Sequence, residues 1–80
     1  MDRSWSSELA IDGSLSVRVN GEHRRVMGPM TVSELLREIG LDPHRVAVER
    51  NLSVVPRSLL RETAVEDGDD YEIVHIVGGG

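Results

Sequence analysis

Residues 71–80 read YEIVHIVGGG, and this stretch decides the fold. Strict alternation directs Tyr71 and Ile73 into a core. The same alternation places Val74 and Ile76 on the outer face, where exposed apolar residues favour a partner surface. Three glycines follow without interruption. They have no Cβ and reach roughly 10 Å when extended, so the stretch predicts a strand that delivers a carboxylate into a narrow enzyme channel.

The chain has 80 residues and no cysteine, which limits it to one small domain with an aliphatic core. A net charge of −5 disfavours nucleic acid and anionic membranes as partners. No apolar run approaches the ~20 residues of a membrane span, so we expect a cytoplasmic protein that is monomeric when free. Residues 1–14 show no period and end in Asp-Gly-Ser, which predicts a flexible extension before a domain at 15–80.

The first part of this domain predicts a hairpin. Residues 15–20 alternate between apolar and polar side chains, as a half-buried strand does. Asn20-Gly21 then gives the strongest short hairpin signal, because a type I′ turn needs positive φ at both central residues. Residues 22–27 form the return strand near a sheet edge, with Val26 facing inward.

Thr31 to Ile39 is the clearest helix signal in the chain. Its apolar residues are spaced as one helical face, and Thr31 with Glu34 forms a capping box. Gly40 follows at the position where a left-handed residue ends a helix, and Leu41 can pack back on Leu36.

Shorter elements complete the chain. Strands are predicted at 46–50, with Ala47 facing outward, and at 54–55. Residues 57–63 predict an irregular or single-turn segment with Leu59 and Leu60 tucked inward. The order is therefore β-β-α-β-β-β. A helix crossover allows the final strand to lie beside the first, in the middle of a mixed sheet of about five strands. One helix covering one face of such a sheet is an α+β fold of the β-grasp (ubiquitin-like) type.

Several segments match a known family over residues 15–80. They are Val19–Glu22, Thr31–Leu36, Val46–Glu49, Val55–Ser58, Asp67–Asp69 and Glu72–Gly80. With these segments the chain resembles the ThiS family, the sulfur carriers of thiamine biosynthesis within the wider ThiS/MoaD group of ubiquitin-like proteins. The last two segments, in that order, are the specific ones. The turn after Asn51 departs from the family pattern, because a glycine is usual there and this chain has Leu52-Ser53.

The resemblance implies a carrier and not an enzyme. In the family an E1-like adenylyltransferase of the ThiF type activates the terminal glycine carboxylate with ATP and Mg²⁺. A persulfide sulfur, supplied by a donor such as a cysteine desulfurase, converts the adenylate to a thiocarboxylate. A thiazole synthase of the ThiG type then takes the sulfur. Mapped on this chain, the acceptor is Gly80, and the chain itself binds no cofactor.

Affinity for these partners must come from the body of the domain, because glycines offer almost no side-chain contact. The predicted partner-binding residues are Ala47, Val74, Ile76, Val77, Gly78 and Gly79.

Other functions remain open. The small subunit of molybdopterin synthase has the same fold and a similar tail, and a ubiquitin-like modifier or plain interaction module is a further class. An independent enzyme is disfavoured, since no nucleophile–base pair or cofactor loop is visible.

Two groups of polar residues receive structural interpretations. His23, His44 and His75 lie on three separate elements without ligand spacing, so no metal site is expected. The acidic residues Asp67, Asp69, Asp70 and Glu72 are interpreted as a solvated turn.

Overall fold

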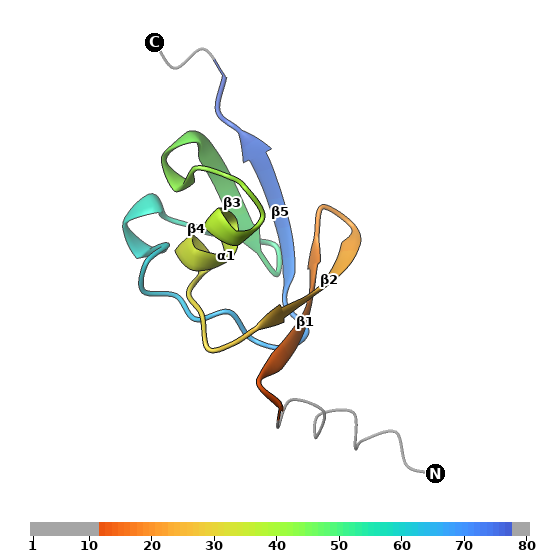
Figure 1. Ribbon diagram of the computed structural model, residues 1–80. Helices are drawn as coiled ribbons and strands as arrows, with labels where there is room; N and C mark the ends of the chain where they lie inside the picture. The colour runs from red at the N-terminus through yellow and green to blue at the C-terminus, as the bar shows by residue number, and fades with distance from the viewer. Residues whose placement is uncertain (1–11, 78–80) are drawn as a thin grey trace.

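The computed structural model describes residues 12–77, in which a mixed sheet is covered on one face by an α-helix (Figure 1). Short 3-10 segments flank the third and fourth strands. The elements are β1 (Ser14–Val19), β2 (Glu22–Met27), α1 (Val32–Glu38), η2 (Pro43–Arg45), β3 (Val46–Arg50), β4 (Ser53–Val55), η3 (Arg57–Leu59) and β5 (Asp70–His75). No helix in this range is long and apolar enough to cross a membrane.

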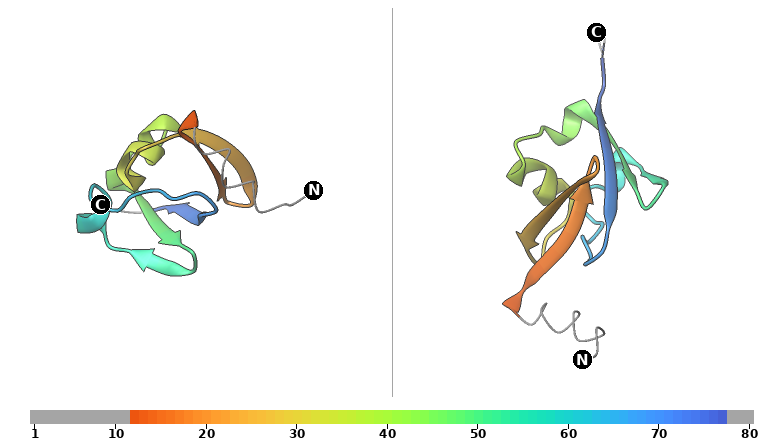
Figure 2. Two further views of the ribbon diagram at one scale, coloured as in Figure 1. Left: turned by 90° about the horizontal axis from the view of Figure 1, so that it is seen from below. Right: turned by 90° about the vertical axis from the view of Figure 1, so that its right-hand side faces the viewer.

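Strand β5 lies in the middle of the sheet, as the sequence predicts. The strand order is β2-β1-β5-β3-β4. β5 is parallel to β1, with Arg18 opposite Asp70, and antiparallel to β3, with Ala47 opposite Val74. Both views in Figure 2 show α1 against one face of the curved sheet. The β-grasp fold is therefore confirmed.

The first strand begins at Ser14, which is 5% exposed and already paired with Met27 of β2. The preceding Gly13 carbonyl accepts a hydrogen bond from the Gly28 N–H at 2.6 Å. The ordered sheet thus takes in the end of the stretch that was predicted as an extension. Residues 1–11 lie outside the described residues.

Both ends of α1 have the capping predicted from the sequence. The Thr31 hydroxyl accepts from the Glu34 N–H at 3.2 Å, and a Glu34 carboxylate oxygen accepts from the Thr31 N–H at 2.8 Å. At the other end Gly40 has φ +88°, and the Leu41 N–H donates to the Leu36 carbonyl at 2.8 Å. These bonds satisfy backbone groups that a short helix would otherwise leave unpaired.

The core lies between α1 and the sheet. Leu35 and Leu36 are fully buried there, together with Tyr71 of β5. The inward prediction for Leu60 is confirmed at 3% exposed, whereas the prediction for Leu59 is wrong at 43% exposed. Leu59 is the last residue of the short 3-10 turn η3, where successive side chains are rotated by about 120°, and this rotation directs Leu59 to solvent while Leu60 enters the core.

Candidate functional site

The end of β5 forms the base of the predicted tail. The strand ends at His75, and the Ile76 N–H still donates to the Arg45 carbonyl at 2.9 Å. Val77 follows and is 88% exposed. Gly78, Gly79 and Gly80, which include the predicted sulfur acceptor, lie outside the described residues. The chain therefore leaves the sheet directly after Ile76.

An exposed apolar surface lies beside this base, on the sheet face opposite α1. Val74 is 59% exposed and is the cross-strand neighbour of Ala47, as predicted. Val54 of β4, which the sequence reasoning did not select, is 70% exposed and lines a shallow hollow of about 240 Å³ with them. Ile76, 46% exposed, follows Val74 by two residues. We call Ala47, Val54, Val74 and Ile76 the outer-face patch.

The acidic residues Asp67, Asp70 and Glu72 are exposed, as expected for a solvated turn, but the interpretation is wrong for Asp69, the residue before β5. Its side chain is only 5% exposed. One carboxylate oxygen accepts from the Arg50 Nε, the Tyr71 hydroxyl and the Glu66 N–H, each at 2.8 Å. The other accepts from the Asn51 amide at 3.0 Å. The carboxylate therefore links β3, the β3–β4 turn and β5.

This network shifts the ionisation of its members. Burial raises the pKa of the Asp69 carboxyl, but the hydrogen bond from Arg50 and those from the neighbouring donors outweigh burial, so the pKa is lowered from its usual value. Burial is the main cause that raises the pKa of the Tyr71 hydroxyl, and its bond to Asp69 adds to the effect. Asp69 is thus held as a carboxylate and Tyr71 as a neutral donor. The arrangement is structural, since both carboxylate oxygens accept hydrogen bonds from donors of the chain itself.

Two asparagines at the hairpin turns hold β5 from both sides. The Asn20 amide donates to the Ile73 carbonyl at 3.0 Å, and its carbonyl oxygen accepts from the Ile73 N–H at 2.7 Å. Asn51 accepts from the Asp70 N–H at 2.9 Å and donates to Asp69. The side chain of Asn20 therefore continues the β1–β5 ladder beyond the end of β1, which keeps the strand that leads to the tail in place.

The three histidines lie on separate elements of the structure. His23 Nε2 is hydrogen bonded to the Ser16 hydroxyl, and His44 and His75 lie on other elements. Within residues 12–77, no group of three histidine or carboxylate side chains comes close enough to hold a metal ion.

The comparisons with known proteins agree with this geometry. The model of the ThiS family matches residues 17–80, which includes both β5 and the glycines. The chain belongs to the ThiS family. A solved ThiS-family structure, a thiamine biosynthesis protein (ThiS) from Geobacter metallireducens, is 35% identical and has a TM-score of 0.70, with 82% of this chain and 100% of that chain covered.

Two further relatives of this ThiS-family chain have informative names. The sulfur carrier protein ThiS of Bacillus subtilis is 40% identical over 50 residues, which are 62% of this chain and 76% of that protein. A thiazole synthase of Paramagnetospirillum magneticum is 53% identical over 62 residues, 78% of this chain. The match covers only 19% of the thiazole synthase, so this chain spans about a fifth of that relative's length.

Proposed function

We propose that this chain is the sulfur carrier for thiazole formation in thiamine biosynthesis. The observation that carries the proposal is the family match, which extends through residue 80 and so takes in the glycine acceptor. The fold supports it, because central strand β5 leads directly to the glycines. The function of the Bacillus subtilis relative as named, a sulfur carrier, is consistent with this role.

The proposed reaction begins at the Gly80 carboxylate. A carboxylate is a poor acyl electrophile, so an E1-like enzyme first transfers AMP to it from ATP with Mg²⁺, and pyrophosphate leaves. A persulfide sulfur attacks the acyl carbon and displaces AMP, which gives an acyl disulfide. A thiol reduces that disulfide and leaves the thiocarboxylate. The sulfur comes from a donor such as a cysteine desulfurase.

The chain itself supplies no catalytic side chain to these steps. Its contribution is to present a peptide without Cβ atoms, Gly78 to Gly80, to the active sites of its partners. The partners provide the phosphate-binding and acid–base groups. The buried cluster around Asp69 fits this division of roles, because it holds β5 in place and takes no part in the reaction.

Partner recognition is assigned to the outer-face patch together with Val77, Gly78 and Gly79. An interface centre is typically apolar, and a few residues carry most of its energy. Val74 occupies the middle of the patch, opposite Ala47 and two residues before Ile76. The ThiF-type activating enzyme and the ThiG-type thiazole synthase would dock there in turn.

The similarity to a domain within a thiazole synthase supports that enzyme as the acceptor of sulfur. In the Paramagnetospirillum magneticum relative, the matching domain and the rest of the enzyme form one protein. Linking two modules raises the effective concentration of one at the other, which benefits partners that must meet in every cycle.

The experiment that tests the function is intact mass measurement. The protein is incubated with ATP, a cysteine desulfurase, a thiol and the activating enzyme. A gain equal to replacement of one oxygen by sulfur, in the C-terminal peptide, is expected. A variant with one residue added after Gly80 keeps the fold and should gain nothing. Equal sulfuration of that variant would overturn the proposal.

The pathway is tested with the sulfurated protein. It should support thiazole phosphate formation with thiazole synthase, deoxyxylulose phosphate and a glycine-derived imine. Molybdopterin formation with the large subunit of molybdopterin synthase should be poor. Turnover with the molybdopterin synthase large subunit but not with thiazole synthase would assign the chain to molybdenum cofactor biosynthesis.

The docking surface is tested with Val74→Asp, which places a charge in the centre of the patch. We expect a loss of about 2 kcal/mol or more in binding to each partner, and a change of at most roughly 1 kcal/mol in the free energy of unfolding. Glu72→Gln, on the same face and strand, is the matched control. A stable Val74→Asp variant that binds both partners normally would exclude this face.

A further inference from the structure

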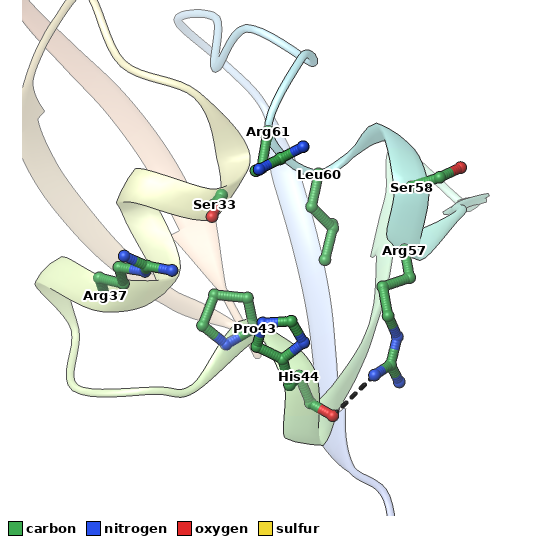
Figure 3. A pocket seen from close by; sticks show the side chains of 8 residues that line it. All are labelled: Ser33, Arg37, Pro43, His44, Arg57, Ser58, Leu60 and Arg61. Carbon is green, nitrogen blue, oxygen red and sulfur yellow. Dashed lines mark hydrogen bonds between the residues drawn. The ribbon is translucent and has the colours of Figure 1, made fainter.

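A second hollow, of about 400 Å³, opens between α1, η2 and the segment that begins with η3 (Figure 3). It differs from the outer-face patch in its position, in its chemistry and in all of its residues. The lining consists of Ser33, Arg37, Pro43, His44, Arg57, Ser58, Leu60 and Arg61.

Positive charge is concentrated in this hollow. Three arginines line it and no carboxylate does, in a chain whose net charge is −5. Within residues 12–77, neither Arg37 nor Arg61 forms an ion pair, whereas Arg50 pairs with Asp69 and Arg45 with Asp42. Two guanidinium groups are therefore available to a ligand. Like charges at one site repel each other, so an anion between them would be favoured.

Ser33, a nearly buried polar residue of α1, lines the hollow. Ser33 is only 6% exposed. Its backbone N–H donates to the Leu60 carbonyl at 2.8 Å, and its hydroxyl has no hydrogen-bond partner among the described residues 12–77. Figure 3 shows Ser33 between Arg37 and Arg61, at the edge of the same space. A nearly buried hydroxyl without a partner costs stability unless a ligand or water binds it.

The wall opposite Ser33 is held in a fixed position. The Arg57 Nη1 donates to the His44 carbonyl at 2.8 Å, which ties η3 to η2 across the hollow. A smaller hollow of about 310 Å³ shares Ser33, Arg37 and Arg61 with the first and is completed by Thr31 and Glu34. The Glu34 carboxylate accepts the hydrogen bond of the Thr31 N–H in the capping box. The three shared side chains thus face both spaces and form their common centre.

We propose that Arg37, Arg61 and Ser33 form a binding site for a phosphate-type oxyanion. The planar guanidinium group matches the oxygens of phosphate in a bidentate geometry, and charge-assisted hydrogen bonds of this kind are stronger than neutral ones. The Ser33 hydroxyl donates a further hydrogen bond to the oxyanion. The ligand is inorganic phosphate, pyrophosphate or the phosphate group of a small metabolite, which share this chemistry. The site does not depend on the proposed sulfur chemistry.

The test is a titration of the ¹⁵N-labelled chain with inorganic phosphate and, separately, with pyrophosphate and a phosphate monoester, all at constant ionic strength. We expect saturable amide shifts confined to the lining residues, and the tightest of the three probes identifies the source of the phosphate. Arg37→Gln/Arg61→Gln should weaken binding about tenfold or more. Arg18→Gln/Arg24→Gln removes the same charge elsewhere and should change binding less than about twofold.

Charge-preserving variants separate a formed site from general attraction. Arg37→Lys/Arg61→Lys keeps the net charge but loses the bidentate geometry, so it should also bind more weakly. Ser33→Ala should weaken phosphate binding and leave the amide shifts of residues far from the hollow unchanged, as expected for an intact fold. Equal binding by the lysine variant, or shifts without saturation, would overturn the site. Shifts with an oligoglutamate peptide but not with phosphate would overturn it too, and would assign the surface to an acidic protein partner.

Discussion

The two hairpin turns have nearly the same backbone but different residues. At the β1–β2 turn, Asn20 and Gly21 have φ values of 50° and 85°; at the β3–β4 turn, Asn51 and Leu52 have 52° and 72°. Glycine reaches this region without strain and asparagine visits it readily, whereas a residue such as leucine is strained there by roughly 1–2 kcal/mol. Leu52 is also 90% exposed.

The contrast shows that the asparagines, and not the residues after them, define both turns. Each asparagine occupies the left-handed region and uses its side chain to hold β5. The second position is then free to vary at a cost in stability. Leu52 lies in the turn directly before β4, the strand that carries Val54 of the outer-face patch.

The largest expected effect comes from removing the anchor of the second turn. Asp69→Ala leaves Arg50 and the Tyr71 hydroxyl without their acceptor in a nearly buried position, and we expect it to lower the free energy of unfolding by about 3–5 kcal/mol. Asp70→Ala, an exposed acid next to it, should change stability by less than about 0.5 kcal/mol. Urea melts of both variants measure this. A similar loss in both would show that Asp69 has no special role.

The same carboxylate gives a pH dependence. Because the pKa of Asp69 is lowered in the folded protein, its contribution is fully present above the unfolded value of about 3.9 and is lost as the pH falls through the folded pKa. The difference in unfolding free energy between wild type and Asp69→Ala should therefore be largest near pH 7 and shrink at pH 3. A difference that grows on acidification would contradict the lowered pKa.

A smaller loss in the free energy of unfolding is expected when either turn asparagine is replaced, and the two losses can be compared directly. Asn→Gly keeps positive φ accessible at each turn and removes only the side-chain hydrogen bonds. Asn20→Gly leaves both backbone groups of Ile73 without their partner. Asn51→Gly leaves one backbone group, the Asp70 N–H, and removes one of four donors to Asp69, which keeps the other three. We expect losses of about 2–3 and about 1 kcal/mol, respectively. Chemical denaturation of the two variants measures the order, and the reverse order would mean that the second turn is the tighter clamp.

Smaller effects are expected when the residues at the second position of the two turns, Gly21 and Leu52, are exchanged. Leu52→Gly relieves the positive φ and should raise the free energy of unfolding by about 0.5–1 kcal/mol, while Gly21→Leu should lower it by about 1–2 kcal/mol. Thermal melts of both variants test the pair. Destabilisation by Leu52→Gly would show that the leucine makes a contact that outweighs its strain.

Local sequence patterns predicted those parts of the fold that depend on neighbouring residues. The capping box at Thr31, the left-handed Gly40 and the outward direction of Val74 all follow from spacing alone, and the structure has each of them. The central position of β5 also followed, because the element order restricts how the strands can connect.

The features that were missed depend on distant partners. Asp69 appeared to be one acid among several, and only its contacts with Arg50 and Asn51, 19 and 18 residues away, identify it as buried. The arginines around Ser33 come from separate elements without a spacing motif. Val54 could have been found, since alternation with half-buried Val55 directs it outward. The binding roles of the outer-face patch and the glycines stay predictions.

The placement of β5 has a consequence for synthesis. Both hairpins and α1 leave the ribosome before β5, yet each hairpin meets the rest of the sheet only through that strand. Arg18 can pair with Asp70 only after residue 70 has been synthesised. Contacts between residues so far apart in the sequence are slow to form. A nascent chain interrupted before residue 70 therefore lacks its central strand and leaves two unjoined hairpins. Completion of the sheet is thereby coupled to synthesis of the segment that carries the glycines.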